Sequence, residues 1–179
     1  MHTSLIGSIF PPELPIILLR LTLAFIAGAV MGLEREWFYR DVHRQKAAGF
    51  RTYSLVCFGS CLFGLASIYG FSSNGVNNDP GRVAAQVVTG MGFLGAGAIL
   101  KFNGEVKGLT TAAGMWVASA IGLLFSAGMY ITAIVAALFA YLTLDFHRIF
   151  PRLFKGRVDD ELCEQERTKP ENGTVQDDD

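Results

Sequence analysis

The residues of this chain that could bind an ion flank its long apolar segments. They combine carboxylate, guanidinium, ammonium and hydroxyl groups, and comprise Glu34, Arg35, Glu36, Arg51, Thr52, Lys107, Thr110 and Thr111. Basic side chains beside the first amides of two helices favour an anion, such as a phosphate or a lipid headgroup. The carboxylates favour a hydrated divalent cation instead. A third interpretation is a structural clamp, in which we expect Glu34 or Glu36 to pair with Arg51.

A second group of polar residues lies along the apolar segment between residues 79 and 97. It begins with Asp79-Pro80, which is typical of a helix N-terminus because the carboxylate accepts a hydrogen bond from an otherwise unpaired amide. The group comprises Asp79, Arg82, Gln86, Thr89, Gly90, Gly92, Gly95 and Gly97. A polar stripe within a membrane span faces protein or water. We therefore expect it either to form hydrogen bonds between helices or to line an aqueous vestibule on the outer side. The acidic candidates for a metal site in the whole chain are Glu34, Glu36 and Asp79.

The glycines at residues 90–97 form the string G-x-G-x-x-G. A dinucleotide-binding fingerprint, however, follows a strand, opens a helix at a water-accessible site, and has an acidic residue about 20 positions further on. Residues 90–97 lie in the middle of an apolar segment instead. Glycine costs about 1 kcal/mol relative to alanine in a helix interior. The cluster therefore indicates either close contact between helices or a local break that exposes the backbone to an ion.

Apolar segments bounded by charged residues define the elements that must position these groups. The longest, residues 108–144, exceeds the roughly 20 residues of one span and suits two, with a turn at Ser126-Ala127-Gly128. The chain is 51% hydrophobic and 17% charged, which agrees with a membrane protein. The predicted fold is an all-α integral membrane bundle of five transmembrane helices. They cover residues 14–33, 52–71, 83–100, 109–125 and 129–144.

Lysine and arginine predict the orientation of this bundle. They concentrate in residues 34–51 and 101–107 and at the start of the tail, whereas Arg20 and Arg82 lie near the opposite ends of the helices. Because cytoplasmic loops are enriched in Lys and Arg, we expect residues 1–13 outside and a cytoplasmic tail. No basic residue precedes Arg20, which is unlike a secretory signal, so the first span is expected to be retained. Arg20 itself is expected at the outer interface.

The domain predicted from these spans covers residues 14–147, and a different kind of sequence follows it. Residues 148–179 are charged and lack apolar periodicity, which predicts a disordered cytoplasmic tail. Cys57 and Cys61 share one helix face and are expected to be small packing residues.

Small residues recur at every fourth position in every predicted span. They are Gly28 and Gly32, Ser60 and Gly64, Gly92 and Ala96, Gly114 with Ala118 and Gly122, and Ala133 and Ala137. Small residues let helix backbones approach closely in a bilayer, where helices gain little hydrophobic energy from association. We therefore expect close packing between the helices.

Residues 31–36, 48–52, 79–97 and 108–113 resemble, in order, the signatures of the MgtC/SapB family of bacterial inner-membrane proteins. The resemblance covers roughly residues 14–144. Two features depart from the family pattern. Phe50 stands where the family usually has leucine, and a polar tail stands where longer members carry a soluble ACT-type domain.

This resemblance implies a non-enzymatic membrane protein linked to magnesium homeostasis and to growth at low magnesium. Some members aid bacterial survival inside host cells, and the best-known member is thought to restrain the F-type ATP synthase. It also implies a multi-pass protein of the bacterial inner membrane with no bound cofactor beyond an association with Mg²⁺. The expected partners are the lipid bilayer and either further copies of the chain or a larger membrane complex, and no nucleic acid.

The alternative function is a small oligomeric permease for magnesium or another cation. In this interpretation Gln86, Thr89 and glycine backbone of several copies would line the path. An enzyme is not expected, because the three histidines are scattered and no nucleophile and base can be paired.

Overall fold

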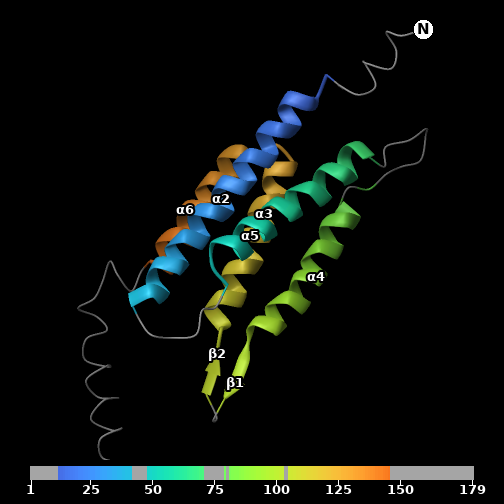
Figure 1. The fold of residues 1–179 in the computed structure, drawn as a ribbon. Helices are drawn as coiled ribbons and strands as arrows, with labels where there is room; N and C mark the ends of the chain where they lie inside the picture. Colours follow the sequence, from blue (N-terminus) through green and yellow to red (C-terminus); the bar gives the residue numbers. More distant parts are fainter. Residues whose placement is uncertain (1–11, 42–47, 71–78, 80, 103–104, 146–179) are drawn as a thin grey trace, which may run out of the picture. The chain divides into compact units, whose positions relative to one another are not determined.

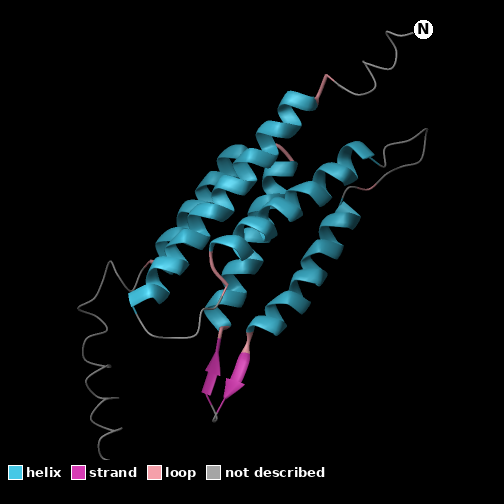
Figure 2. Ribbon diagram, viewed as in Figure 1, coloured by secondary structure: helices cyan, strands magenta, loops and turns pink. Residues whose placement is uncertain are grey.

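The computed structural model describes residues 12–41, 48–70, 79, 81–102 and 105–145. Its elements are α2 (Leu14–Asp41), α3 (Phe50–Leu65) with the π-helical turn η1 (Ala66–Gly70), α4 (Gly81–Ala98), β1 (Leu100–Phe102), β2 (Glu105–Lys107), α5 (Leu109–Ser126) and α6 (Tyr130–Leu144). Successive helices run in opposite directions (Figures 1 and 2). The end of α2, the start of α3 and the end of α4 therefore lie at one end of the bundle, called here the Arg35 end.

The five helices overlap the five predicted segments, so the helical fold class is confirmed. The first helix is longer than predicted, because α2 continues from residue 33 to Asp41 and includes residues expected in a loop. By length and composition, three of them could each cross a membrane: Leu14–Glu36, Phe50–Gly70 and Leu109–Ser126. The fifth helix, α6, is apolar but shorter, and α4 is not among the three. The described helices are those of a membrane protein.

Helices α2, α3 and α5 form the core. The largest fully buried side chains include Tyr53, Phe125, Met31 and Ile121. Polar groups inside the core bond across helices, since the Tyr53 hydroxyl donates to the Thr111 carbonyl oxygen at 3.2 Å. The hydroxyls of Ser60 and Ser119 lie 2.8 Å apart. These bonds link α3 to α5 in an environment that offers no water as a substitute partner.

The predicted close packing is confirmed for these three helices. A Cβ atom at Gly28 would lie 2.5 Å from the carbonyl oxygen of Tyr53, and one at Gly122 would overlap the carbonyl oxygen of Cys57. Side chains larger than hydrogen therefore do not fit at these positions. The buried thiols of Cys57 and Cys61 fill space in the same core, as expected.

The turn predicted between the last two helices is also present. Gly128 has φ 77°, and its amide donates to the Phe125 carbonyl at 3.0 Å, which ends α5 in a left-handed cap. Arg20 contacts this turn, because its Nη1 donates to the Ser126 carbonyl oxygen at 2.6 Å and its Nε to the Tyr130 hydroxyl at 3.2 Å. A guanidinium at the negative end of a helix is favourable. Arg20 thus joins α2 to the α5–α6 turn rather than only marking the membrane interface.

Helix α4 differs from the core helices. It packs against α5, but only Met91 among its side chains is buried. A Cβ atom at Gly90, Gly92 or Gly97 would meet no other atom within 4 Å. The helix is continuous from Gly81 to Ala98, so the predicted alternative of a local break is wrong. Close contact within the chain is also wrong for these three glycines, because none of them lies against another helix among the described residues.

Two elements were not predicted. The segment expected to be a loop after α4 is an antiparallel hairpin with Leu100 opposite Lys107 and Lys101 opposite Val106. Its sequence signal is Asn103-Gly104 between two extended runs. The second is η1, where α3 changes to π-helical hydrogen bonding before Gly70.

Candidate functional site

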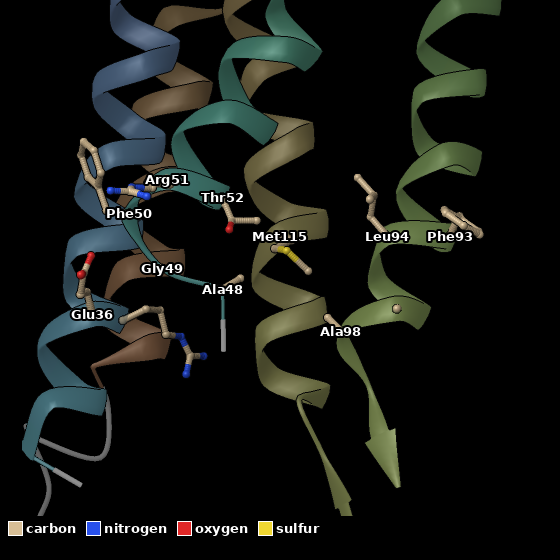
Figure 3. A pocket seen from close by; sticks show the side chains of 12 residues that line it. Glu36, Ala48, Gly49, Phe50, Arg51, Thr52, Phe93, Leu94, Ala98 and Met115 are labelled. Atoms are coloured by element: carbon tan, nitrogen blue, oxygen red, sulfur yellow. The ribbon is translucent and has the colours of Figure 1, made fainter. Parts of the chain in front are cut away.

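A cavity of about 1040 Å³ lies at the Arg35 end, between α4 and the start of α3 (Figure 3). Its polar lining comes from Arg35, Glu36, Arg51 and Thr52, and the rest from Ala48, Gly49, Phe50, Phe93, Leu94, Gly97, Ala98 and Met115. Leu94 of α4 and Met115 of α5 point toward one another across the open space. The cavity is therefore amphipathic, with a charged side at α2 and α3 and an apolar side at α4 and α5.

The position of Arg35 follows from the periodicity of α2. Ala24, Gly28, Met31 and Arg35 recur at helical spacing, and all four are buried. Arg35 therefore lies on the same buried face of α2 as the three residues before it in this series. The side chain of Arg35 is 7% exposed and its Nε lies 3.8 Å from Glu34 Oε2.

The contact between Arg35 and Glu34 is an ion pair but is too long for a hydrogen bond. Nε and Nη2 of Arg35 have no hydrogen-bond partner in the part of the chain that the structure describes. Buried donors without acceptors are costly, the more so on a charged group. Arg35 therefore has unused hydrogen-bonding capacity beside the cavity, on two nitrogens that are themselves almost fully enclosed.

The start of α3 supplies further donors. Gly49 is its N-cap and provides no side-chain cap, and the first helical bond runs from the Tyr53 amide to the Gly49 carbonyl at 3.1 Å. The amides of Phe50, Arg51 and Thr52 precede this bond and have no acceptor one turn back in the helix. Gly32 holds this turn against α2, because a Cβ atom there would lie 2.6 Å from the Phe50 Cα.

The structure brings five residues of the predicted polar cluster together and separates the others. Glu34, Arg35, Glu36, Arg51 and Thr52 lie where α2 and α3 meet. The remaining three belong to β2 and the start of α5: Lys107 and Thr110 are exposed, and Thr111 is buried with its Oγ1 lacking a hydrogen-bond partner. None of these three lines the cavity, so the start of α5 does not join the start of α3 in one site.

The expected ion pair with Arg51 is not formed among the described residues. Arg51 is exposed on the first turn of α3, and the ion pair found at this interface joins Glu34 to Arg35. Glu36 is exposed, and its carboxylate oxygen lies 3.6 Å from the position that a Cβ atom would take on Gly49.

The stripe on α4 points away from the packed core. Arg82, Gln86 and Thr89 are exposed, and the Thr89 hydroxyl donates to the Ala85 carbonyl of its own helix at 3.0 Å. Asp79 Oδ1 accepts from the Gly81 amide at 2.9 Å, which confirms the predicted cap. The cavity reaches Gly97, at the Arg35 end of the stripe, and not Arg82. The cavity therefore lies at the Arg35 end of the bundle and does not correspond to the vestibule expected at the outer end.

The three acidic candidates for a metal site do not meet. Asp79 precedes α4 at the end of the bundle opposite to Glu34 and Glu36 (Figure 1). Within the described ranges, no three His, Cys, Asp or Glu side chains are grouped in a way that could hold a metal ion. The buried guanidinium beside Glu34 also makes this end less suited to a cation.

Sequence reasoning missed several lining residues. Leu94, Ala98 and Met115 carry no chemical signal, and they enter the site because four helices meet there. The burial of Arg35 had a signal, since it falls on the helical face of Gly28 and Gly32.

Comparison with known proteins assigns the family. The MgtC family model matches residues 21–153. The chain belongs to the MgtC family. It is 46% identical over 141 residues to the "Putative magnesium transporter YhiD" of Escherichia coli K12, covering 76% of this chain and 63% of that protein. It is 43% identical over 107 residues to Protein MgtC of Salmonella typhimurium LT2, covering 60% of this chain and 42% of that protein.

The region shared with the MgtC family contains the whole cavity, including Arg35 and Met115. The chain spans less than two thirds of the length of these relatives. No solved structure matches it significantly.

Proposed function

We propose that this MgtC-family chain is a non-enzymatic membrane protein linked to magnesium homeostasis and adaptation to low magnesium. In this proposal it regulates a membrane complex, such as the F-type ATP synthase, and does not itself conduct the ion. The link to magnesium is supported by the family and by the name of the YhiD relative.

The observation that carries the regulatory role is the filled interior of the bundle. Tyr53, Phe125, Met31 and Ile121 occupy the space between α2, α3 and α5 with almost no exposed surface. The buried hydroxyls of Ser60 and Ser119 bond to each other. An ion path through a membrane needs polar groups open to water. A core packed in this way favours a protein that acts through its surfaces.

Two surfaces are suited to contacts with a partner. The first is the exposed surface of α4, where Gly90 and Gly97 on one side and Gly92 on another would let a second helix approach closely. The second is the Arg35 end. In this proposal they bind either further copies of the chain or a larger membrane complex.

The proposed orientation follows the positive-inside rule. The Arg35 end carries Arg35, Arg51, Lys101 and Lys107, while Arg20 and Arg82 lie toward the other end. We infer a multi-pass protein of the bacterial inner membrane with its five helices crossing, its N-terminus outside and the Arg35 end cytoplasmic. A cysteine introduced at Thr110 should be labelled only after permeabilisation, and labelling from outside would contradict this orientation.

The decisive experiment compares transport with growth. The purified protein in liposomes that enclose a magnesium-sensitive dye should give the same influx as protein-free liposomes. The same chain should restore growth at low magnesium to cells that lack their own family member. Magnesium influx in the protein-containing liposomes would contradict the regulatory role.

A second candidate, an oligomeric cation permease, is favoured by one observation. Gln86 and Thr89 are exposed on α4, on a helix expected to lie in lipid. Several copies could turn these groups toward a shared path. Influx that Gln86→Leu lowers, while assembly is unchanged, would support this candidate.

A further inference from the structure

We propose that the cavity at the Arg35 end binds a phosphate group, and that its apolar side accommodates the rest of an anionic phospholipid. This inference goes beyond the proposed function and does not depend on it. It rests on the donors around the cavity, the burial of one of them, and the two-sided lining.

The buried guanidinium of Arg35 is the first component. Its side chain is 7% exposed, it lines the cavity, and its Nε and Nη2 have no hydrogen-bond acceptor among the described residues. Glu34 offsets part of its charge at 3.8 Å from Nε. The unoccupied donors suit an oxyanion, because arginine recognises phosphate through several N–H groups at once.

The start of α3 is the second component. Residues 48–52 all line the cavity, and the first-turn amides lack both a side-chain cap and an intrahelical acceptor. A helix N-terminus with free amides attracts anions through its dipole and its donors. Arg51 adds a second positive charge at the same edge. An anion at this turn would accept from the first-turn amides, and a rotation of the Arg35 side chain would bring its enclosed Nε and Nη2 to the same anion.

Glu36 limits the site on its exposed side. Its carboxylate lies beside Gly49 and lines the same cavity, so it repels an anion that binds at the start of α3. This carboxylate gives the proposal a directional test, because removing its charge should strengthen anion binding.

The apolar side indicates which phosphate compound fits best. Leu94 and Met115 face one another across the cavity, and Phe93, on the other side of α4 in this view, is 82% exposed. An inorganic phosphate would use only the charged side. A phospholipid would place its headgroup against Arg35 and its acyl chains along α4, and would bury apolar surface in addition.

The experiment measures ligand binding to the full chain purified in detergent. Dihexanoyl phosphatidylglycerol, dihexanoyl phosphatidylcholine and inorganic phosphate are titrated separately at constant ionic strength, and affinity is taken from the shift of the thermal unfolding midpoint. The variants are Arg35→Gln, Glu36→Gln and, as the matched control at the opposite end of the bundle, Arg82→Gln.

The expected result is that phosphatidylglycerol binds more tightly than phosphatidylcholine. Loss of a charged hydrogen-bonding group should weaken that affinity by about tenfold or more in Arg35→Gln. Glu36→Gln should strengthen it a few-fold, and Arg82→Gln should leave it unchanged. Inorganic phosphate should compete with the lipid, because both would bind the same donors. Equal affinities for phosphate and phosphatidylglycerol would support a site for the phosphate group alone, and a tighter affinity for phosphatidylglycerol would support a phospholipid.

The proposal is overturned if Arg35→Gln and Glu36→Gln change the binding of phosphatidylglycerol and phosphate no more than Arg82→Gln does. If Arg35→Gln does not fold, Arg51→Gln takes its place, because Arg51 is exposed and lines the same cavity. Opposite effects of Arg51→Gln and Glu36→Gln then support the site, and equal behaviour of both with the control overturns it. None of these measurements involves magnesium flux, so this result and the result for the proposed function are independent.

Discussion

Helices α5 and α4 carry similar small residues and use them differently. In α5, Gly114 and Gly122 lie against Tyr53 and Cys57 of α3, with no room for a Cβ atom. In α4, a Cβ atom at Gly92 or Gly97 would have no neighbouring atom within 4 Å. The spacing of small residues thus identifies a face that another helix can approach, but it does not say whether that helix belongs to the same chain.

The polar groups on the two helices reinforce this difference. Ser119 of α5 bonds to Ser60 of α3, whereas among the described residues Thr89 of α4 bonds to its own helix. The α5 face is complete within one chain. The α4 face is the one on which the proposed partner contacts depend.

The largest effect should come from adding one methyl group to each face. Gly122→Ala would force a Cβ atom into the Cys57 carbonyl, so we expect a loss of about 3 kcal/mol or more in the free energy of unfolding. Gly92→Ala meets no atom and replaces a poor helix former, so we expect no loss, or a gain of up to about 1 kcal/mol. Denaturant unfolding of both variants in the same detergent measures the difference.

Equal losses in the two variants would show that α4 is packed as tightly as α5, and the comparison would fail. Substitution of the same two glycines by leucine tests the difference between the helices more sharply. Gly122→Leu should abolish folding, while Gly92→Leu should leave the isolated chain folded and reduce only its association with other molecules, as read by cross-linking in membranes.

Most of the helical architecture could be predicted from charge-free runs, because a bilayer requires long apolar helices and tolerates charge only near their ends. The cap at Asp79 and the turn at Gly128 followed from local chemistry. The hairpin after Ala98 was missed because charged residues at 101–107 were interpreted only as a loop. The π-helical turn η1 depends on hydrogen-bond geometry that single-residue patterns do not encode.

The candidate site was predicted less well. Sequence placed Arg35, Glu36 and Arg51 at one level of the bundle, and all three line the cavity. Which charges pair depends on the rotation of α2, and that rotation is set by Gly28 and Gly32 packing on α3. The apolar wall of Leu94 and Met115 could not be predicted, because it exists only where α4 and α5 face the start of α3.

The next effect concerns two arginines at the end opposite Arg35. Arg20 donates to the Ser126 carbonyl and the Tyr130 hydroxyl, whereas Arg82 is exposed on α4. Arg20→Gln should lower the free energy of unfolding by about 2 kcal/mol, because it removes charged hydrogen bonds and the favourable charge at the end of α5. Arg82→Gln should change it by less than about 0.5 kcal/mol. Similar losses would mean that α4 is held in the fold as firmly as the α5–α6 turn.

The smallest effect should come from the hydroxyl groups of the two helix faces. Ser60→Ala leaves the Ser119 hydroxyl without its partner, and hydrogen bonds between helices in membranes average about 0.6 kcal/mol, so we expect a loss near that value. Thr89→Ala removes a bond made within α4 and introduces a better helix former, so we expect no loss. Unfolding in detergent resolves the pair if both are measured beside Ser60→Ala/Ser119→Ala. Because that double variant leaves no buried hydroxyl unpaired, it should be no less stable than Ser60→Ala alone. A double variant much less stable than Ser60→Ala would show that each serine contributes through packing rather than through their shared hydrogen bond, and the contrast between bonded α5 and self-bonded α4 would then lose its energetic basis.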